Sequence, residues 1–294
     1  MKASVVIPTK DKISRLRLVL QAFESQVNDQ VEIVVVFDGC SSETIHQFRN
    51  LRLSYEPVAV ISKHNVGRSS ARNLGIAKAK GDVIIFVDDD RIPAPDFIQK
   101  HMTGHEEPCV LLGLRTDVMY EEEELYSLYE LGHVRDNPDC VRTRLLEGEL
   151  QQGFPAFLLK SSLKWLLFYT GNVSVDREYL VKAGGFDENF KGWGHEDLDL
   201  GIRLHMSGIP FRRDDAIVNY HILHDDNFDI KQRKKESIRN LVYMIGKYKK
   251  HYISWILSLV YVKHKLFGIT YNRKHLQSQV FSPNDMKNRS VINK

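Results

Sequence analysis

Short apolar runs alternate with amphipathic stretches along the first third of the chain. Unbroken apolar runs of this kind predict strands that are buried on both faces of a parallel sheet, and apolar residues spaced three or four apart predict helices. We expect strands at residues 4–8, 31–37, 58–62 and 83–87, and helices at residues 13–23, 41–51 and 69–79. This alternation predicts a Rossmann-like, mostly parallel α/β sheet flanked by helices.

The pattern is less regular in the rest of the chain. We expect a short helix at residues 96–101, a strand at 109–116, a helix with a solvated face over 120–139, and a loop at 147–160 that could act as a lid or binding segment. An apolar stretch from Trp165 onwards is typical of a strand. Further elements are a strand at 173–175, a helix through Leu198, Ile202 and His205, a strand at 216–222 and a basic helix at 231–250.

Three consecutive carboxylates, Asp88, Asp89 and Asp90, follow the fourth expected strand. Their mutual repulsion is costly unless a cation or hydrogen-bond donors compensate it. Ligands of open α/β sheets bind beyond the carboxyl ends of the strands, and hard oxygen ligands there suit Mn²⁺ or Mg²⁺ together with substrate phosphates. We therefore predict a metal-dependent nucleotide-diphosphate site, with a solvated acidic turn as the alternative. An EF-hand loop is disfavoured because its required glycine is missing.

The usual nucleotide fingerprints are absent from the chain. It has neither the spaced glycines of a dinucleotide-binding turn nor a Walker-type Gly-Lys-Ser/Thr. A phosphate site would therefore have to rely on the metal. His221 lies at the end of the strand expected at residues 216–222, and His224 follows that strand. Either could be a third metal ligand, although a lone histidine is more often structural.

A second candidate site lies in the stretch Gly192-Trp193-Gly194-His195-Glu196-Asp197. It predicts a loop that runs into a helix with both acids in the first turn, where the helix dipole favours an ionised carboxylate. Such a carboxylate can accept a proton from an acceptor hydroxyl. Acids in a first turn usually only cap the helix, but Trp193 between two glycines adds a flat apolar face that suits a sugar ring.

Positive charge is concentrated towards the C-terminus. Residues 231–294 contain 15 Lys and Arg against two acids, a net charge of +13, and the preceding residues carry 26 against 36, or −10. Such a tail predicts an anionic partner (membrane, nucleic acid or acidic polymer), or else a solvated helix face. Tyr252–Val262 is uncharged but too short to span a bilayer; it suits membrane-interface contact, or packing on the core or a subunit.

The length and composition allow one large domain with an appendage, since the chain has 294 residues and is 43% hydrophobic. The N-terminus does not resemble a signal peptide. The three cysteines, Cys40, Cys109 and Cys140, are not in metal-ligand spacing and are most simply reduced thiols. We expect a cytoplasmic protein, with peripheral membrane contact through the basic C-terminus as an option.

Taken together, the motifs resemble those of the inverting glycosyltransferases of family 2, with the GT-A fold, over about residues 3–226. The matching stretches are Val5-Val6-Ile7-Pro8-Thr9, Val34-Val35-Val36-Phe37-Asp38-Gly39, Asn65-Val66-Gly67, Ala71-Arg72-Asn73, Asp88-Asp89-Asp90 and Gly192-Trp193-Gly194-His195-Glu196-Asp197. The last also resembles the acceptor motif of galactosyl- and N-acetylgalactosaminyltransferases and of chondroitin-type polymerases. The resemblance implies a catalytic domain at residues 1–229, with a nucleotide-sugar half (1–116) and an acceptor half (117–229), and a basic helical extension at residues 230–294.

The resemblance also implies roles for single residues. The nucleotide would be bound by Pro8, Thr9, Asp38, Arg68, Arg72 and Asp88, with Asp38 on the uracil edge. The metal would be bound by Asp90 with Asp88, and by His221 or His224. Asp197 would be the catalytic base, Glu196 its neighbour on the acceptor hydroxyls, and Trp193 the wall of the sugar site. Phe37 is a departure, because family members commonly carry an acid there.

These residues predict a metal-dependent, inverting transfer of a sugar from a nucleotide donor, expected to be UDP-linked, to an acceptor hydroxyl. The acceptor would be a glycan, a lipid-linked molecule or a peptide, and no nucleic-acid partner is expected. A nucleotidyltransferase is one alternative, although the loop after the first strand lacks the basic, glycine-rich character it would need. A non-catalytic glycan-binding relative is the other, and the presence of both acid groups argues against it.

Overall fold

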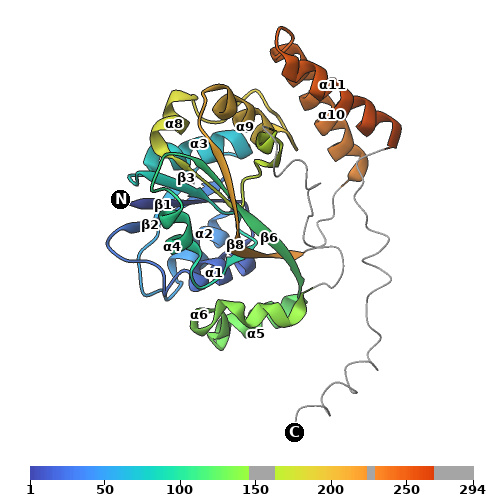
Figure 1. Cartoon of the computed structure of the whole chain (residues 1–294). Coiled ribbons are helices and arrows are strands. Elements are labelled where there is room, and N and C mark those ends of the chain that lie inside the picture. Colours follow the sequence, from blue (N-terminus) through green and yellow to red (C-terminus); the bar gives the residue numbers. More distant parts are fainter. Residues whose placement is uncertain (146–162, 224–228, 268–294) are drawn as a thin grey trace, which may run out of the picture. The chain divides into compact units, whose positions relative to one another are not determined.

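The computed structural model describes residues 1–145, 163–223 and 229–267 of the chain (Figure 1). The chain divides into two compact units, Met1–Asp229 and Ile230–Lys294. An eight-stranded sheet in the order β3-β2-β1-β4-β7-β6-β8-β5 forms the centre of the first unit. This mixed α/β architecture confirms the expected fold class.

The first four strands pair in parallel, as their apolar runs predict. β1 (Ala3–Thr9) lies between β2 (Val31–Asp38) and β4 (Val83–Phe86), and β3 (Val58–Ser62) lies outside β2. The helices that connect them are α1 (Ile13–Ala22), α2 (Ser42–Arg49) and α3 (Arg68–Lys78). Because all four strands run the same way, the loops after β1, β2 and β4 meet at one edge of the sheet.

Alternate residues of the buried strands enter two separate hydrophobic clusters. Val5 and Ile7 belong to one cluster, together with residues of α1 and α4 (Phe97–Thr103). Val6 belongs to the other, together with residues of α3, α8 (Arg177–Lys182) and α9 (Glu196–Met206). Figure 1 shows these two groups of helices on opposite sides of the sheet. Both faces are therefore covered, which explains the unbroken apolar runs.

The second half of the sheet is mixed. β7 (Val173–Asp176) runs antiparallel between β4 and β6 (Val110–Met119). β8 (Phe211–Leu223) runs parallel to β6, and the short β5 (Arg91–Pro93) runs antiparallel to β8. β8 thereby brings its C-terminal residues beside β5, directly after the three acids that follow β4.

The acidic stretch after β6 is helical, as expected, but is broken into short pieces. It forms α5 (Glu122–Glu130), α6 (His133–Asp136) and the 3₁₀ helix η1 (Pro138–Arg144). The break falls at Gly132, which adopts φ +69°. The loop expected at residues 147–160 lies outside the described residues.

The strand expected from Trp165 onwards is not formed. Lys164–Leu167 is the 3₁₀ helix η2, and it packs against α9. A Cβ atom on Gly201 of α9 would lie 2.8 Å from Phe168 Cβ and 2.9 Å from the carbonyl oxygen of Trp165. β7 is already paired on both sides, by β4 and β6. The apolar run therefore does not pair with β7 and is buried against helix α9 instead. Hydrophobicity alone does not show whether an apolar run is a strand or a buried helix.

The described part of the second unit is a pair of helices, α10 (Ile230–Lys247) and α11 (Tyr252–Phe267), that pack against each other. Buried side chains include Leu241, Met244, Ile253 and Leu257. Within the described residues, no helix combines the length and the apolar character needed to cross a membrane.

Gly75 of α3 allows this helix to lie close against β1 and β2. A Cβ atom there would be 2.3 Å from Val6 Cγ1 and 3.2 Å from Val36 Cγ2. We expect Gly75→Ala to lower the free energy of unfolding by about 1–3 kcal/mol, because overpacking outweighs the better helix propensity of alanine. Chemical denaturation measures the change.

The matched control is Gly246→Ala in α10, where a Cβ atom meets no described atom within 4 Å. Alanine is better than glycine in an exposed helix, so this variant should be neutral or stabilised by up to about 1 kcal/mol. A stabilised Gly75→Ala variant would contradict the close packing of α3 on the sheet.

Candidate active site

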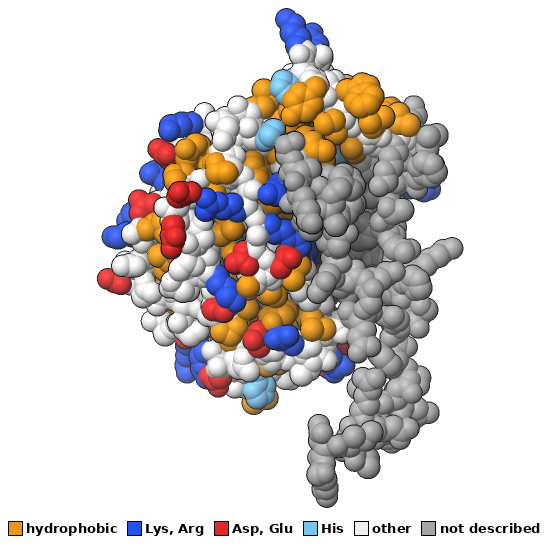
Figure 2. All heavy atoms as spheres, viewed as in Figure 1, with side chains coloured by type: hydrophobic (Ala, Val, Ile, Leu, Met, Phe, Trp, Pro, Cys, Tyr) orange, Lys and Arg blue, Asp and Glu red, His pale blue; other side chains and the backbone are white. Residues whose placement is uncertain are grey.

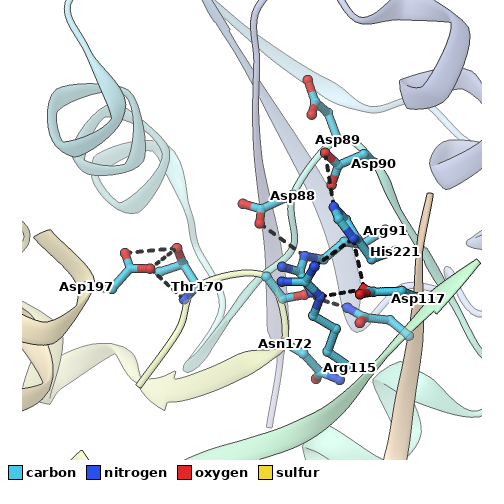
Figure 3. A network of polar contacts seen from close by, with 12 residues as sticks. Asp88, Asp89, Asp90, Arg91, Arg115, Asp117, Thr170, Asn172, Asp197 and His221 are labelled. Atoms are coloured by element: carbon cyan, nitrogen blue, oxygen red, sulfur yellow. Dashed lines mark hydrogen bonds and ion pairs between the residues drawn. The ribbon is translucent and has the colours of Figure 1, made fainter. Parts of the chain in front are cut away.

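The three acids after β4 are held by hydrogen bonds and ion pairs, and Figure 3 shows those of Asp88 with Arg91 and of Asp90 with His221. Asp88 accepts from Arg72 Nη2 at 3.3 Å and from Arg91 Nε at 3.1 Å. Asp89 accepts a hydrogen bond from Thr9 Oγ1 at 2.7 Å. Donors and cations of the chain thus compensate the repulsion within the triplet, as the sequence requires.

Asp90 is the member of the triplet that faces a histidine. Its Oδ2 lies 3.4 Å from Lys12 Nζ and 3.8 Å from His221 Nε2. Burial raises the pKa of the neighbouring Asp89 to about 7, with Lys12 opposing the rise and Asp90 adding to it. Asp89 is therefore partly protonated near neutral pH, which limits the negative charge of the cluster.

Glu196 and Asp197 start helix α9, as the sequence predicts. Gly192, Gly194 and His195 all have positive φ, which turns the loop sharply before the helix. Asp197 accepts hydrogen bonds from the backbone N–H of Thr170 at 3.1 Å and from its hydroxyl at 3.0 Å. Glu196 is buried beside it.

Arg72 joins the two groups of acids. Its Nη1 lies 3.2 Å from Glu196 Oε1 and 3.4 Å from Asp197 Oδ1, while its Nη2 contacts Asp88. The guanidinium is buried, and the three carboxylates hold its pKa above the ordinary value although burial alone would lower it. One cation therefore fixes the acids after β4 and the acids of α9 in a single site.

Burial raises the pKa of Asp197 to about 6, with Arg72 opposing the rise and Glu196 and Asp88 adding to it. A carboxylate of this kind is mostly ionised at neutral pH but is a stronger base than an exposed one. These are the properties that general base catalysis requires.

A short turn connects both groups to the sheet. Thr170 binds Asp197, and Asn172 donates to the carbonyls of Leu114 and Ile217, at 2.9 and 3.0 Å. Between them, Gly171 adopts φ +124°, and a Cβ atom there would lie 2.7 Å from Asp88 Oδ2 and 2.5 Å from Arg91 Nε. Only glycine fits this position without disturbing the contact between Asp88 and Arg91.

Helix α3 and the loop before α9 are held together by a second contact. Asn73 donates to the carbonyl of Phe186 at 2.9 Å and accepts from its N–H at 2.8 Å. The Phe186 ring also lies 5.5 Å from the Arg72 guanidinium carbon. The stretches Ala71-Arg72-Asn73 and Gly184-Gly185-Phe186 are therefore two halves of one contact.

His221 is held by β6 from the side opposite Asp90 (Figure 3). Its Nδ1 lies 2.9 Å from Asp117 Oδ1, and Arg115 contacts both of these groups. Burial lowers the pKa of His221, which Asp117 and Asp90 only partly oppose. Nδ1 of the ring faces both Asp117 and the Arg115 guanidinium, and Nε2 faces Asp90.

Other residues predicted to bind the nucleotide lie around the same edge of the sheet. Pro8 and Thr9 end β1, and Arg68 is exposed in the first turn of α3. Asp38 ends β2 and accepts from the backbone N–H groups of Val66 and Gly67, at 2.6 and 3.1 Å. The conformation of the Asn65-Val66-Gly67 turn is thus tied to Asp38.

Trp193 is half-buried in the loop before α9. His224 lies outside the described residues, so that only His221 is located beside the triplet.

Several residues of the site were not identified in the sequence: Lys12, Arg91, Arg115, Asp117 and Thr170. Arg91 directly follows the acids, and Thr170 precedes Gly171-Asn172. The neighbouring sequence could therefore have identified both as candidate site residues. Asp117 lies at the end of a strand with no motif around it, and only the pairing of β6 with β8 brings it to His221.

The donor set suits a divalent cation but is incomplete by itself. Within the described ranges, no group of three or more His, Cys, Asp or Glu side chains is arranged to hold a metal ion. Asp90 and His221 supply one carboxylate oxygen and one imidazole nitrogen, both of which Mn²⁺ accepts. Such ions commonly retain waters and bind substrate phosphates, so two protein ligands are sufficient. The residues present therefore fit a metal that is completed by a bound diphosphate.

Comparison with known proteins agrees with this architecture. Residues 4–166 match glycosyl transferase family 2, and residues 157–225 match the N-terminal domain of galactosyltransferase. The chain is 31% identical to an uncharacterized glycosyltransferase of Bacillus subtilis, YfnE, over 84% of this chain and 71% of that protein. It is 33% identical to validoxylamine A glucosyltransferase of Streptomyces hygroscopicus, over 70% of this chain and 52% of that protein.

The chain is also 26% identical to the chondroitin synthase of Escherichia coli, over 74% of this chain. It spans only 34% of that protein.

Solved structures with the same fold include GalNAc-T7 with UDP, GalNAc and Mn²⁺ (TM-score 0.60, 15% identity), covering 84% of this chain and 48% of that one. S. aureus TarS with UDP-GlcNAc has a TM-score of 0.58 and 15% identity, covering 82% of this chain and 66% of that one. At this level of identity, these likenesses establish the fold.

The fold is that of the GT-A glycosyltransferases, and the named relatives are glycosyltransferases. The chain belongs to glycosyl transferase family 2. The nucleotidyltransferase alternative is thereby set aside.

Arg72 offers a test of the site that does not depend on its substrates. Removing one partner from a buried ion-pair network typically costs about 3–5 kcal/mol, and we expect a loss of this size for Arg72→Met well above pH 6. Arg72 attracts the carboxylates only in their ionised form. The deficit should therefore shrink as the pH falls through about 6, where Asp197 takes up a proton. Urea unfolding across a pH series measures it.

Arg72→Lys is the matched control, because it keeps the charge but not the two-pronged contact. It should lose less stability than Arg72→Met at every pH. A deficit for Arg72→Met that is independent of pH would show that the guanidinium acts by packing rather than by charge.

Proposed function

We propose that the chain is a metal-dependent, inverting glycosyltransferase that moves a sugar from a UDP-linked donor to an acceptor hydroxyl. The observation that carries this proposal is the position of Arg72, within 3.4 Å of both Asp88 and Asp197. A donor-binding acid and a candidate base are thereby close enough to act on one sugar. Two structural neighbours are complexes with UDP-GlcNAc or with UDP and GalNAc, which supports a UDP-linked donor, and a third is a complex with GDP-Man.

The donor would bind across the carboxyl ends of β1, β2 and β4. Pro8, Thr9 and Asp38 would line the pocket of the base, and Arg68 is exposed beside it. Asp38 would act on the base through one oxygen while its hydrogen bonds to Val66 and Gly67 keep the turn in place. Asp88 is already engaged by Arg72 and Arg91, which supports a role beside the ribose rather than as the main metal ligand.

Asp90 and His221 would hold Mn²⁺ or Mg²⁺. When bound, the ion would neutralise the charge that develops on the leaving diphosphate. Asp117 would be a positioning residue that fixes the orientation of the His221 ring through Nδ1. His221 is favoured over His224 because its Nε2 faces Asp90.

The acceptor would bind at the start of α9. Trp193 would contact the apolar face of a sugar ring, and Glu196 would accept from its hydroxyls. Asp197 would take the proton of the attacking hydroxyl while the oxygen forms a bond to the anomeric carbon. The bond from that carbon to the diphosphate oxygen breaks on the opposite face, so that UDP leaves and the configuration inverts. Holding both reactants in line lowers the barrier further.

Asp197→Asn tests the base. The amide keeps the shape of the side chain but cannot take a proton, so transfer should fall by roughly 100- to 10,000-fold while UDP affinity stays nearly unchanged. In the unmodified chain, kcat/KM should fall as the pH drops through about 6, because Asp197 becomes protonated there. Transfer from the donor found in a panel of nucleotide sugars provides the assay.

Glu196→Gln is the matched variant. It also removes a carboxylate beside Arg72, but it should raise the KM for the acceptor more than it lowers kcat. An equal loss of transfer and UDP binding in Asp197→Asn, or an acid limb that is absent near pH 6, would remove Asp197 from the role of base.

The metal site can be tested by direct binding of Mn²⁺ in the presence of UDP, followed by electron paramagnetic resonance. Asp90→Asn and His221→Ala should each weaken Mn²⁺ binding by at least tenfold, because each removes one of two protein ligands. Asp89→Asn is the matched control: this side chain is bound to Thr9, and its loss should have a much smaller effect. Unchanged Mn²⁺ affinity in Asp90→Asn would place the metal elsewhere.

A further inference from the structure

Helix α11 has apolar side chains on two faces, and among the described residues α10 packs against one of them. The side chains of Ile253 and Leu257 are fully buried in the second unit. On the other apolar face, four side chains are about half or more exposed: Tyr252 (55%), Trp255 (71%), Leu259 (54%) and Val262 (49%). Their spacing of three, four and three residues places these four on one side of the helix. We call them the α11 stripe.

Figure 2 shows hydrophobic side chains gathered over these helices. Single exposed apolar residues are normal on soluble proteins, but a contiguous row with a tryptophan at its centre marks a surface that binds something. Helix α11 does not span a bilayer, since no described helix is long and apolar enough to do so. Its length and composition are those of a helix that lies in the plane of a membrane interface.

Charge identifies the partner. The turn between the two helices exposes Lys249 and Lys250, and α10 carries five further Lys and Arg in its first ten residues. Over residues 231–294 the net charge is +13. A second copy of the chain would set two such surfaces against each other, which repulsion opposes. An anionic bilayer combines the apolar layer that the stripe needs with the negative charge that the lysines need.

Tryptophan and tyrosine strengthen this assignment. Their rings are apolar while the indole N–H and the phenolic O–H remain able to hydrogen-bond, and both residues are therefore enriched where lipid meets water. Trp255 and Tyr252 lie at the end of α11 next to the lysines of the turn. Aromatic residues and basic residues thus occur together, as they do in interfacial helices.

We propose that the α11 stripe, with Lys249 and Lys250, is a docking surface for an anionic lipid bilayer. The stripe enters the headgroup region and the lysines contact acidic headgroups. The contact would hold the enzyme at a surface where membrane-bound acceptors lie. This proposal does not rest on the proposed reaction, because the surface uses none of the residues of the active site.

Flotation of the full chain with vesicles tests the proposal, without donor, acceptor or metal. Binding is expected to phosphatidylcholine vesicles that contain phosphatidylglycerol, with weak binding to phosphatidylcholine alone, and high salt should reverse it. Addition of the anionic vesicles should shift the tryptophan emission to the blue, and a Trp255→Phe variant should lose that shift. Absence of flotation at low salt would overturn the proposal.

Two double variants separate the apolar and the charged contributions. Trp255→Ser with Leu259→Ser should weaken vesicle binding by at least tenfold, because it removes two of the side chains that enter the headgroup region. Lys249→Glu with Lys250→Glu should weaken it by roughly 30-fold, at about 1 kcal/mol for each lysine lost. Vesicle binding that survives in the stripe variant would also overturn the proposal.

The matched controls carry the same substitutions on the first unit. Leu131→Ser with Val181→Ser changes two side chains that are 64% and 59% exposed, and Lys78→Glu with Lys80→Glu changes two exposed lysines. Neither control should alter vesicle binding. Light scattering gives the mass of each variant: an oligomer that the stripe variant dissociates, without vesicle binding, would identify a second copy of the chain as the partner instead.

Discussion

The site depends on one buried cation, Arg72, that is shared by three carboxylates. Desolvating a guanidinium is expensive, and desolvating three acids around it is more so. Each group is tolerated because the others are present. The arrangement has little value for stability, since well-packed apolar side chains would serve as well. Its value lies in holding acids from two distant parts of the chain at fixed positions without allowing them to repel one another.

The sheet explains why the acids can be brought together at all. The parallel strands β1, β2 and β4 end at the same edge. The pairing of the strands therefore suffices to place Thr9, Asp38 and Asp88 at that edge. β7 then runs back antiparallel beside β4, and the turn Thr170-Gly171-Asn172 just before it lies at that edge too. Through Thr170 this turn holds Asp197. The mixed half of the sheet thus supplies the turn that holds Asp197.

Local patterns predicted most of the fold and drew attention to the two groups of acids that Arg72 joins. Runs such as Val31–Phe37 are unambiguous because the sheet is covered on both faces, and the acids at the ends of β4 and at the start of α9 carry their own motifs. The strand prediction from Trp165 onwards was wrong, because an apolar run alone does not show whether it forms a strand or a helix. Asp117 and Lys12 could not be found, because their roles arise only from contacts with residues far away in the sequence.

The polar contacts beneath the acids show how the site is kept rigid. Asn172 is buried and uses its amide nitrogen on two carbonyls, one from β6 and one from β8, while its oxygen lies 3.1 Å from His101 Nε2. Burial lowers the pKa of His101 to about 3, so this ring stays neutral and adds no charge beneath the acids. A turn anchored through neutral groups can place Thr170 and Gly171 precisely without altering the balance of charge above it. These neutral contacts therefore hold the turn independently of the protonation state of the carboxylates around Arg72.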